Sequence, residues 1–379
     1  MGFFIDYAYD YINKNKEELS RDNIEIIETR EDTIIILSDG LGTTTRKART
    51  MLEGGATLYE TIETITSTLP FCNVRKLAYS TLTILKISKS GKTHIVEYDN
   101  PPVFFIRDGR LVNLNKKERI IHGKKILESK VQLIKGDSIV LVSDGVINAG
   151  EGEVLTSGWQ WENVAKYLVK QSKIEKCSKL ISKRVIDTAN FLSNEKPGDD
   201  TSIVVVKARE TEKLQVFTGP PKDQNDDSKL VQKILQSKGK KIICGGTAAN
   251  IVSRETGRDI EVDVTTGTDE VPPVAKIEGF DLVTEGVLTL SKVLENIDDY
   301  LVDTHLKDSS WSSQSKDGAS RLTKLFIEDC THMHFYVGEA INKAHQNPDL
   351  PDLGIKTQVI KGIKERLENM GKKVTIEYY

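Results

Sequence analysis

The sequence predicts an α+β protein of two domains: a β-sandwich of packed antiparallel sheets flanked by helices, followed by a smaller α/β domain. Three observations lead to this fold class. The chain has 379 residues, more than the usual ~100–200 of one domain. Short strands follow one another in runs over residues 1–210, and two helix-Gly-Lys-Lys-strand units occur in the remainder.

In the first domain, residues 1–210, six segments are predicted as strands because they are short, apolar and rich in β-branched or aromatic side chains. They are residues 34–37, 80–85, 94–98, 103–106, 138–142 and 202–206. Two helical patterns, 161–171 and 177–192, lie between the last two strands. Strands in runs, rather than in strict alternation with helices, favour antiparallel sheets with helices outside them.

Residues 211–228 are predicted as a linker, since they collect glycine, proline and polar side chains around Gly219-Pro220-Pro221. The second domain is expected over residues 229–379. It opens with a helical apolar stripe, and Gly239 separates this helix from a strand. Its end repeats the order, with Gly371 between a helix and the last strand. These units indicate an α/β domain.

Composition excludes several classes of protein. The 53 basic and 56 acidic residues give a formal net charge of -3, so bulk charge predicts neither a nucleic-acid nor a membrane partner. The longest apolar runs are strand-sized, far below the ~20 residues of a membrane helix. The four cysteines, Cys72, Cys177, Cys244 and Cys330, have no zinc-ligand spacing, and reduced thiols and a cytoplasmic location are expected.

The strongest chemical signal is an apolar strand that runs directly into aspartate and glycine. It occurs as Ser38-Asp39-Gly40 and as Ser143-Asp144-Gly145, while Gly198-Asp199-Asp200 leads into a strand. Carboxylates at strand tips can converge on one point, and an all-oxygen cluster suits Mg²⁺ or Mn²⁺ rather than zinc. A single Asp-Gly is most often a plain turn, but the repeated ending together with Asp199-Asp200 favours a site.

These motifs, in this order, resemble those of the metal-dependent protein phosphatases of the PPM superfamily, in the bacterial branch typified by the SpoIIE sporulation phosphatase. The resemblance covers roughly residues 15–208 and includes Asp22-Asn23 as the early acidic motif. It implies a PPM-type β-sandwich with helices on both outer faces. It also implies hydrolysis of phosphoserine or phosphothreonine by a water that bridges two divalent cations, Mn²⁺ or Mg²⁺.

The resemblance also implies the roles of the individual ligands. Asp39 would bridge the two cations, and the Gly40 carbonyl would bind one of them. Asp144 and Asp199 would bind the first cation and Asp22 would lie beside the second, so that the aspartates act through bound metals and water. Asp22 lies 17 residues before Asp39, about the spacing of a β-hairpin that returns to the same sheet edge. Arg21 stands where the family usually has glycine.

Two features of the second domain leave alternatives open. Gly245-Gly246-Thr247 lies between a strand and a helix start, where backbone N–H groups can bind an anion, although a structural turn is the other interpretation. His332 and His334 alternate on a strand and either bind a metal or are satisfied polar side chains. This half resembles extensions of unassigned activity that accompany SpoIIE-type domains.

The sequence therefore favours a Mg²⁺- or Mn²⁺-dependent serine/threonine protein phosphatase, whose second domain senses a ligand or selects a partner. By the resemblance, the substrate is a phosphorylated protein such as an anti-sigma-factor antagonist, and residues 44–66 act as a switch. A homodimer is a further hypothesis. The alternative is a catalytically weak or switched-off phosphatase fold that serves as a regulatory protein-binding module. A third interpretation places separate small-molecule chemistry around Gly245 to Thr247.

Overall fold

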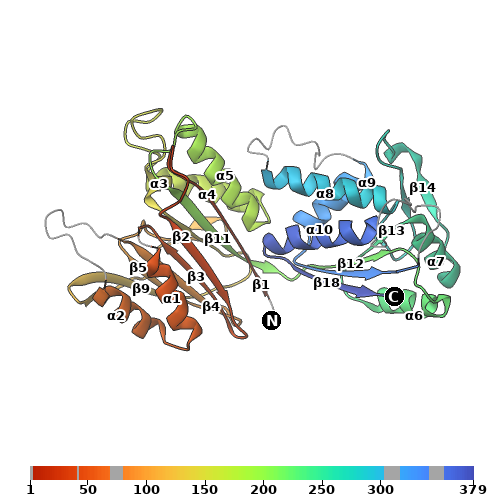
Figure 1. Cartoon of the computed structure of the whole chain (residues 1–379), viewed down its shortest axis with the longest axis horizontal. Coiled ribbons are helices and arrows are strands. Elements are labelled where there is room, and N and C mark those ends of the chain that lie inside the picture. Colours follow the sequence, from red (N-terminus) through yellow and green to blue (C-terminus); the bar gives the residue numbers. More distant parts are fainter. Residues whose placement is uncertain (1–2, 41, 69–79, 303–315, 341–353) are drawn as a thin grey trace. The chain divides into compact units, whose positions relative to one another are not determined.

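The computed structural model describes residues 3–40, 42–68, 80–302, 316–340 and 354–379. The chain forms two compact units, residues 1–210 and residues 211–379 (Figure 1). Among the described residues, the strands assemble into three sheets, two in the first unit and one in the second. The predicted α+β class is confirmed, as is the pair of antiparallel sheets flanked by helices.

The first sheet of the N-terminal unit is antiparallel and has the strand order β1-β11-β10-β6-β7. Its strands are β1 (Phe3–Ile12), β6 (Phe104–Arg107), β7 (Arg110–Leu111), β10 (Ser138–Val142) and β11 (Thr201–Glu210). The helices that belong to it are α3 (Asp144–Ile147), α4 (Trp161–Ile174) and α5 (Ser178–Leu192). Leu168 and Val185 of α4 and α5 pack with Val142 and Ile203 in one core, so these helices cover the outer face of this sheet.

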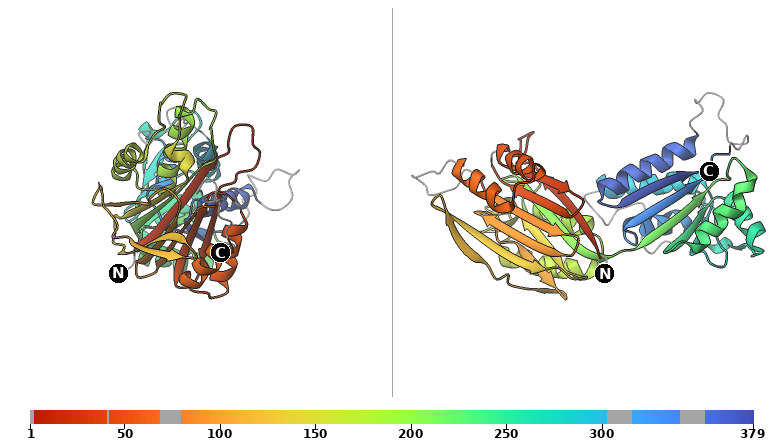
Figure 2. Two further views of the ribbon diagram at one scale, coloured as in Figure 1. Left: turned by 90° about the vertical axis from the view of Figure 1, so that its left-hand side faces the viewer. Right: turned by 90° about the horizontal axis from the view of Figure 1, so that it is seen from below.

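The second sheet is also antiparallel, with the order β2-β3-β4-β5-β9-β8. Its strands are β2 (Asn23–Glu28), β3 (Asp32–Ser38), β4 (Leu82–Ser88), β5 (Lys92–Tyr98), β8 (Lys117–Ile121) and β9 (Lys124–Gln132). The helices α1 (Thr43–Glu53) and α2 (Leu58–Thr68) lie over its outer face, as the right-hand view of Figure 2 shows in red and orange. Ala48 and Ile62 of these helices pack on Ile34 and Ile36.

Strand β3 shows why the two sheets stack face to face. Ile34 and Ile36 point toward α1 and α2, while Ile35 and Leu37 belong to a second core that includes Leu141 of the first sheet. Successive side chains of a strand point to opposite faces, so an unbroken apolar run is buried on both sides. The N-terminal unit is thus layered helix, sheet, sheet, helix.

The C-terminal unit holds one mixed sheet with the order β14-β15-β16-β13-β12-β17-β18. Its strands are β12 (Lys213–Thr218), β13 (Lys240–Cys244), β14 (Glu261–Asp263), β15 (Val274–Lys276), β16 (Leu282–Thr284), β17 (His332–Val337) and β18 (Lys373–Tyr378). In sheet order, the five strands β16, β13, β12, β17 and β18 pair in parallel. Strands β14 and β15 add an antiparallel edge beside β16. Helices connect the parallel strands, which makes this unit a doubly wound α/β sheet.

Helices cover both faces of this sheet. They are α6 (Asp227–Gln236), α7 (Gly246–Thr256), α8 (Val287–Val302), α9 (Gly318–Ile327) and α10 (Ile355–Asn369), with short 3₁₀ turns at Gln224–Asp226 and Val264–Thr266. Leu230 of α6 and Ala248 of α7 share a core with Phe217 and Ile243 of the strands. Figure 1 shows α8 and α10 together on one side of β12 and β18.

The prediction of a linker over residues 211–228 is wrong. Lys213–Thr218 is strand β12, which pairs in parallel with β13 on one side and β17 on the other, and α6 begins at Asp227. Strand β12 is an interior strand of its sheet, and one of its two partners, β17, lies far away in the sequence. The glycine and proline residues of Gly219-Pro220-Pro221 form only the turn that follows this strand.

Other sequence expectations can be compared with the described residues. Cys177, Cys244 and Cys330 are buried and free of disulfide bonds, while Cys72 lies outside the described residues. Within the described ranges, no helix combines the length and apolar character needed to cross a membrane.

Candidate metal centre

The two sheets of the N-terminal unit bring the predicted aspartates to a common edge. Asp39 follows β3 and Asp22 precedes β2, and these antiparallel strands place Asn23 opposite Ser38. Asp144 follows β10 and Asp199 lies just before β11, where the N–H of Ser143 donates to the carbonyl of Ser202. Because antiparallel pairing sets the end of one strand beside the start of the next, each sheet contributes one pair of carboxylates.

Asp39 is held by its own backbone. Its N–H donates to Oγ1 of Thr81 at 3.0 Å, and its carbonyl accepts from the N–H of Thr81 at 2.9 Å. Burial raises the pKa of the Asp39 carboxyl to about 6, and the negative charges of Asp144 and Asp199 act in the same direction. These interactions join carboxylates from both sheets, which supports their convergence at one site.

Asp144 and Asp22 lie in the same electrostatic environment. Burial raises the pKa of Asp144, with a further contribution from Asp199, whereas the backbone N–H of Gly145 acts in the opposite direction. Burial also raises the pKa of Asp22, to about 7, with smaller contributions from Asp39 and Asp200. Several acids that share a small volume without a counterion hold protons more tightly than isolated acids.

Asp22 supplies a direct test of whether a cation fits here. It is only 9% exposed, and within the described residues neither of its buried carboxylate oxygens makes a hydrogen bond. The hydroxyls of Ser143 and Ser202 lie near enough to oppose the rise in its pKa, but they do not reach hydrogen-bond geometry. A buried carboxylate without a partner is costly unless a cation neutralises it.

The donor set therefore fits hard divalent cations, since carboxylate oxygens and the Gly40 carbonyl are the ligands that Mg²⁺ and Mn²⁺ prefer. Gly40 has φ of 112°, a backbone conformation that favours glycine. In the part of the chain that the structure describes, no three acidic, histidine or cysteine side chains are already arranged around one metal position. The aspartates are neighbours, but their carboxylate oxygens do not surround a common point.

Asp200 is the residue that the sequence analysis did not assign. Asp199 is exposed, whereas Asp200 is only 3% exposed. The Asp200 carboxylate accepts from the backbone N–H of Lys14 at 2.8 Å and from that of Arg21 at 2.6 Å. The Arg21 carbonyl in turn accepts from the N–H of Gly40 at 3.3 Å. Asp200 thus ties the segment that carries Asp22 to the start of β11.

The Asp-Gly motif suggests that Gly145 is needed for a turn, but the structure shows that it is needed for close packing. A Cβ at this position would lie 2.1 Å from the carbonyl oxygen of Asp200. The start of α3 therefore packs directly against the Asp199-Asp200 segment, and only glycine permits this approach. The paired aspartates were visible in the sequence, but their division into an exposed and a buried side chain was not.

Arg21 does not obstruct the site. Its guanidinium is 67% exposed and lies 3.5 Å from Glu17, while its backbone makes the hydrogen bonds to Asp200 and Gly40. The positive charge of Arg21 lowers the pKa of Asp39, so the side chain lies close enough to affect the carboxylates. The position usually occupied by glycine in the resembling family thus carries a cation at the rim of the cluster.

The other candidate residues belong to the C-terminal unit. Gly245 has φ of 129° and donates its N–H to the carbonyl of Thr284 at 2.9 Å, so a turn explains this glycine. A Cβ at Gly246 would meet no atom within 4 Å, and α7 begins there with Thr247 as its second residue. Anion binding at Gly245-Gly246-Thr247 stays a prediction.

Ring nitrogens of the two histidines, His332 and His334, make hydrogen-bond contacts with neighbouring side chains. Nδ1 of His332 lies 2.9 Å from Oγ1 of Thr331. Nδ1 of His334 lies 2.6 Å from Oγ1 of Thr375, and its Nε2 lies 3.2 Å from Oε2 of Glu377. Burial lowers the pKa of both rings. The contacts favour satisfied polar side chains over metal ligands.

Comparison with known families assigns part of the chain. Residues 40–209 match the family model of stage II sporulation protein E (SpoIIE). This range includes Gly40, Asp144 and Asp199 but begins after Asp39 and Asp22. No curated protein matches the chain at the sequence level.

Several solved structures are similar to the chain. The phosphatase domain of the cell fate determinant SpoIIE from Bacillus subtilis is 20% identical, with 55% of this chain and 94% of that chain covered and a TM-score of 0.42. The S. agalactiae serine/threonine phosphatase is 16% identical, covering 54% and 100%, with a TM-score of 0.40. RsbX in complex with magnesium is 15% identical, covering 54% and 95%, with a TM-score of 0.40.

Proposed function

Residues 40–209 form a SpoIIE-type phosphatase domain, and from this premise we propose that the chain is a metal-dependent serine/threonine protein phosphatase. One observation carries the proposal: strand ends from both sheets bring Asp39 near enough to Asp144 and Asp199 for their charges to raise its pKa, and Asp39 in turn raises the pKa of Asp22. A cluster of this kind has little structural value in a protein without cations, because like charges at short range are destabilising.

The residues that would hold the cations follow from their positions. Asp39 would bridge two ions, since its charge interacts with Asp22 of its own pair and with Asp144 and Asp199 of the other pair. Asp144 and Asp199 would complete the first position, and Asp22 with the Gly40 carbonyl would complete the second. When bound, two Mn²⁺ or Mg²⁺ ions would activate the attacking water and balance the negative charge of the phosphoryl group. A relative of known structure, RsbX, was solved with magnesium.

The chain's own residues would set the geometry of this centre. Asp200 holds the backbone of Lys14 and Arg21, and this fixes the segment on which Asp22 is carried. Thr81 fixes Asp39 through its backbone and its hydroxyl. Such rigid support counts because small displacements of catalytic groups reduce rates strongly.

Arg21 would contribute to binding the substrate. Its guanidinium is exposed at the rim of an otherwise acidic cluster, where a phosphate monoester dianion needs a positive partner. An arginine can donate two parallel hydrogen bonds to phosphate oxygens. We assign it to the ground-state affinity for the phosphoryl group rather than to the chemical step.

The substrate is proposed to be a phosphorylated protein, such as an anti-sigma-factor antagonist. The helices α1 and α2 cover most of the expected switch segment 44–66. Oγ of Ser80 lies 3.3 Å from Oγ1 of Thr44 and 3.0 Å from Oγ of Ser38, which links the start of α1 to the residue before Asp39. A shift of α1 could therefore reach the metal ligands through this hydroxyl chain.

One feature favours the alternative of a switched-off fold that binds a regulatory partner. The described residues include no ready-made group of three metal ligands. In this alternative the aspartates would stay apart even when cations are supplied, and the domain would act by binding alone.

The decisive experiment measures hydrolysis of p-nitrophenyl phosphate and of a phosphoserine peptide by the full chain, with Mn²⁺, with Mg²⁺ and with EDTA. The phosphatase proposal expects turnover with a cation and its loss on chelation. A folded protein without turnover under any of these conditions would overturn it in favour of the binding module.

A further inference from the structure

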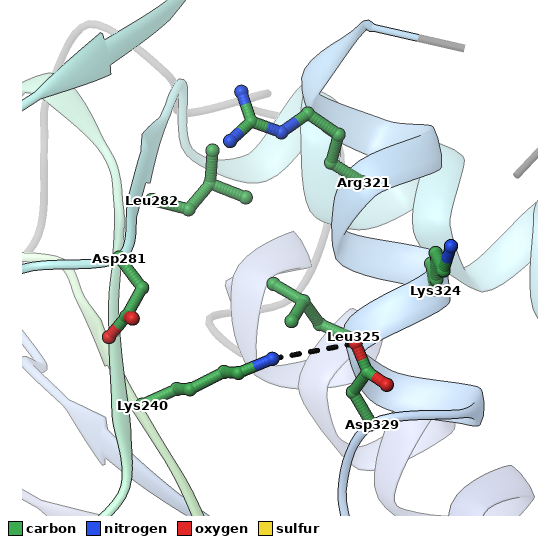
Figure 3. Close-up of a pocket in the computed structure, with 7 residues that line it drawn as sticks. All are labelled: Lys240, Asp281, Leu282, Arg321, Lys324, Leu325 and Asp329. Carbon is green, nitrogen blue, oxygen red and sulfur yellow. Dashed lines mark hydrogen bonds and ion pairs between the residues drawn. The ribbon is translucent and has the colours of Figure 1, made fainter. Parts of the chain in front are cut away.

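The C-terminal unit contains a pocket of about 350 Å³, outside the motifs that the sequence analysis singled out. It lies at the amino ends of β13 and β16, where Lys240 and Leu282 begin these strands, and α9 forms its other wall. Figure 3 shows its lining side chains. The Gly245 loop follows the carboxyl end of β13, so the pocket and the loop lie at opposite ends of that strand.

The wall formed by α9 carries two cationic side chains. Arg321 and Lys324 are three residues apart on this helix, so they project from the same side of it. Both are only partly exposed, and within the described residues neither side chain has a hydrogen bond or ion pair. Partly buried cations without partners are unfavourable by themselves, and an anion in the pocket would remove that cost.

The third cation of the pocket is already neutralised. Nζ of Lys240 lies 3.4 Å from Oδ2 of Asp329. The unbalanced positive charge is therefore that of Arg321 and Lys324, and it lies on one wall rather than around the whole pocket.

The strand side of the pocket has the opposite character. Oδ2 of Asp281 accepts from the backbone N–H of Lys241 at 2.7 Å, which fixes the carboxylate at the pocket wall. Between the two walls, Figure 3 shows the guanidinium of Arg321 above Leu282, with Leu325 also facing the space. The pocket thus offers a cationic wall, an apolar middle and an acidic wall.

We propose that this pocket binds a small molecule with an anionic group at one end and hydroxyl or ammonium donors at the other. The carboxylate or phosphate of the ligand pairs with Arg321 and Lys324, its carbon skeleton lies on Leu282 and Leu325, and its donor groups face Asp281. A volume of about 350 Å³ is at the small end of ligand sites, which limits the ligand to the size of a hydroxy acid, an amino acid or a triose phosphate. The proposal does not depend on the phosphatase activity.

Calorimetric titration of the full chain tests this with matched probes. Glycerol 3-phosphate is compared with inorganic phosphate, and glycerate and L-serine are compared with acetate. We expect glycerol 3-phosphate to bind at least about tenfold more tightly than phosphate, or glycerate or L-serine to bind at least about tenfold more tightly than acetate. The reason is that the additional donor groups of these probes contact Asp281. Tighter binding of glycerol 3-phosphate than of phosphate identifies a phosphate ligand, and tighter binding of glycerate or L-serine than of acetate identifies a carboxylate ligand. Saturable binding by none of the probes would overturn the proposal.

Variants locate the site. Arg321→Gln should weaken binding of the best probe by roughly tenfold to a hundredfold, the value of a charge-assisted hydrogen bond. Lys361→Gln removes one charge from an exposed position of α10 that does not line the pocket, and it should leave the affinity unchanged. Equal effects of the two substitutions would refute the assignment. If Arg321→Gln does not fold, Lys324→Gln takes its place with the same expected direction.

Discussion

The two units of the chain place unpaired charge of opposite sign at different kinds of position. In the N-terminal unit, carboxylates gather at the ends of antiparallel strands, and Asp22 has no hydrogen-bond partner for its buried oxygens within the described residues. In the C-terminal unit, Arg321 and Lys324 line a pocket beside a mainly parallel sheet. Like charges that the fold does not neutralise favour the counterions that we propose: divalent cations in the first unit and an anionic small molecule in the second.

The difference also shows how each site is built. The acidic cluster uses residues that directly follow or precede strands, so its members are marked in the sequence by strand-Asp-Gly motifs. The cationic pocket uses side chains of one helix and of strand starts, and nothing in their immediate sequence distinguishes them from surface residues. Four substitutions or conditions test this contrast, in order of decreasing expected effect.

Asp39→Ala should abolish phosphatase activity to the background of the assay, because Asp39 is the ligand that we propose to be shared by both cations. Hydrolysis of p-nitrophenyl phosphate with Mn²⁺ measures the effect. Asp259→Ala removes an exposed carboxylate from the C-terminal unit and should keep full activity. Retention of activity by Asp39→Ala would refute the proposed centre.

Asp200→Ala should lower activity by about tenfold to a hundredfold and reduce the free energy of unfolding by about 2–4 kcal/mol, since two backbone N–H groups lose a charged acceptor. Asp200→Asn keeps one acceptor oxygen and should recover part of both losses. Calorimetric titration with Mn²⁺ separates positioning from simple stability, because we expect a weaker metal affinity in the folded variant. An unchanged Mn²⁺ affinity would contradict the positioning role.

The pH dependence of stability should differ between the metal-free and the metal-loaded protein. Asp22 and Asp39 have pKa values of about 7 and about 6 in the folded chain, above the ordinary value of 3.8 for an aspartate. The folded state therefore binds more protons than the unfolded state between about pH 4 and pH 7. Their contribution to stability is present below pH 4 and is lost as the pH rises through the folded values.

Urea unfolding in EDTA at several pH values measures this effect. We expect the free energy of unfolding to fall from pH 5 to pH 8, and Asp22→Asn should flatten the curve. Saturating Mn²⁺ should reverse the trend, because metal binding requires deprotonated carboxylates and strengthens as the pH rises. Identical pH profiles with and without Mn²⁺ would show that the cluster does not bind the cation.

Arg21→Gln should have the smallest effect, a rise of about threefold to tenfold in KM with little change in kcat, since we propose that its exposed guanidinium binds the phosphoryl group and takes no part in the chemical step. Arg30→Gln, at an exposed position beyond strand β2, is the matched control and should leave KM unchanged. A fall in kcat at constant KM would place Arg21 in the chemical step.

Much of the N-terminal site could be predicted because its signals are local. A strand that ends in Ser-Asp-Gly specifies both the conformation and the position of the carboxylate, and the spacing of 17 positions from Asp22 to Asp39 fits the β2–β3 hairpin of the structure. The layered fold followed from the same source, because alternating and continuous apolar patterns report which faces of a strand are buried.

Tertiary structure alone decided the remaining features. Asp199 and Asp200 are adjacent and chemically identical, and only the packing of Lys14, Arg21 and Gly145 makes the second a buried support. Residues 213–218 were predicted as part of a linker, and only their pairing with β13 and with the distant strand β17 makes them an interior strand. A short stretch of sequence determines its backbone preferences and its apolar face. Local patterns do not encode which strand pairs with which, or which groups bind an ion or a buried carboxylate. These depend on contacts between distant segments.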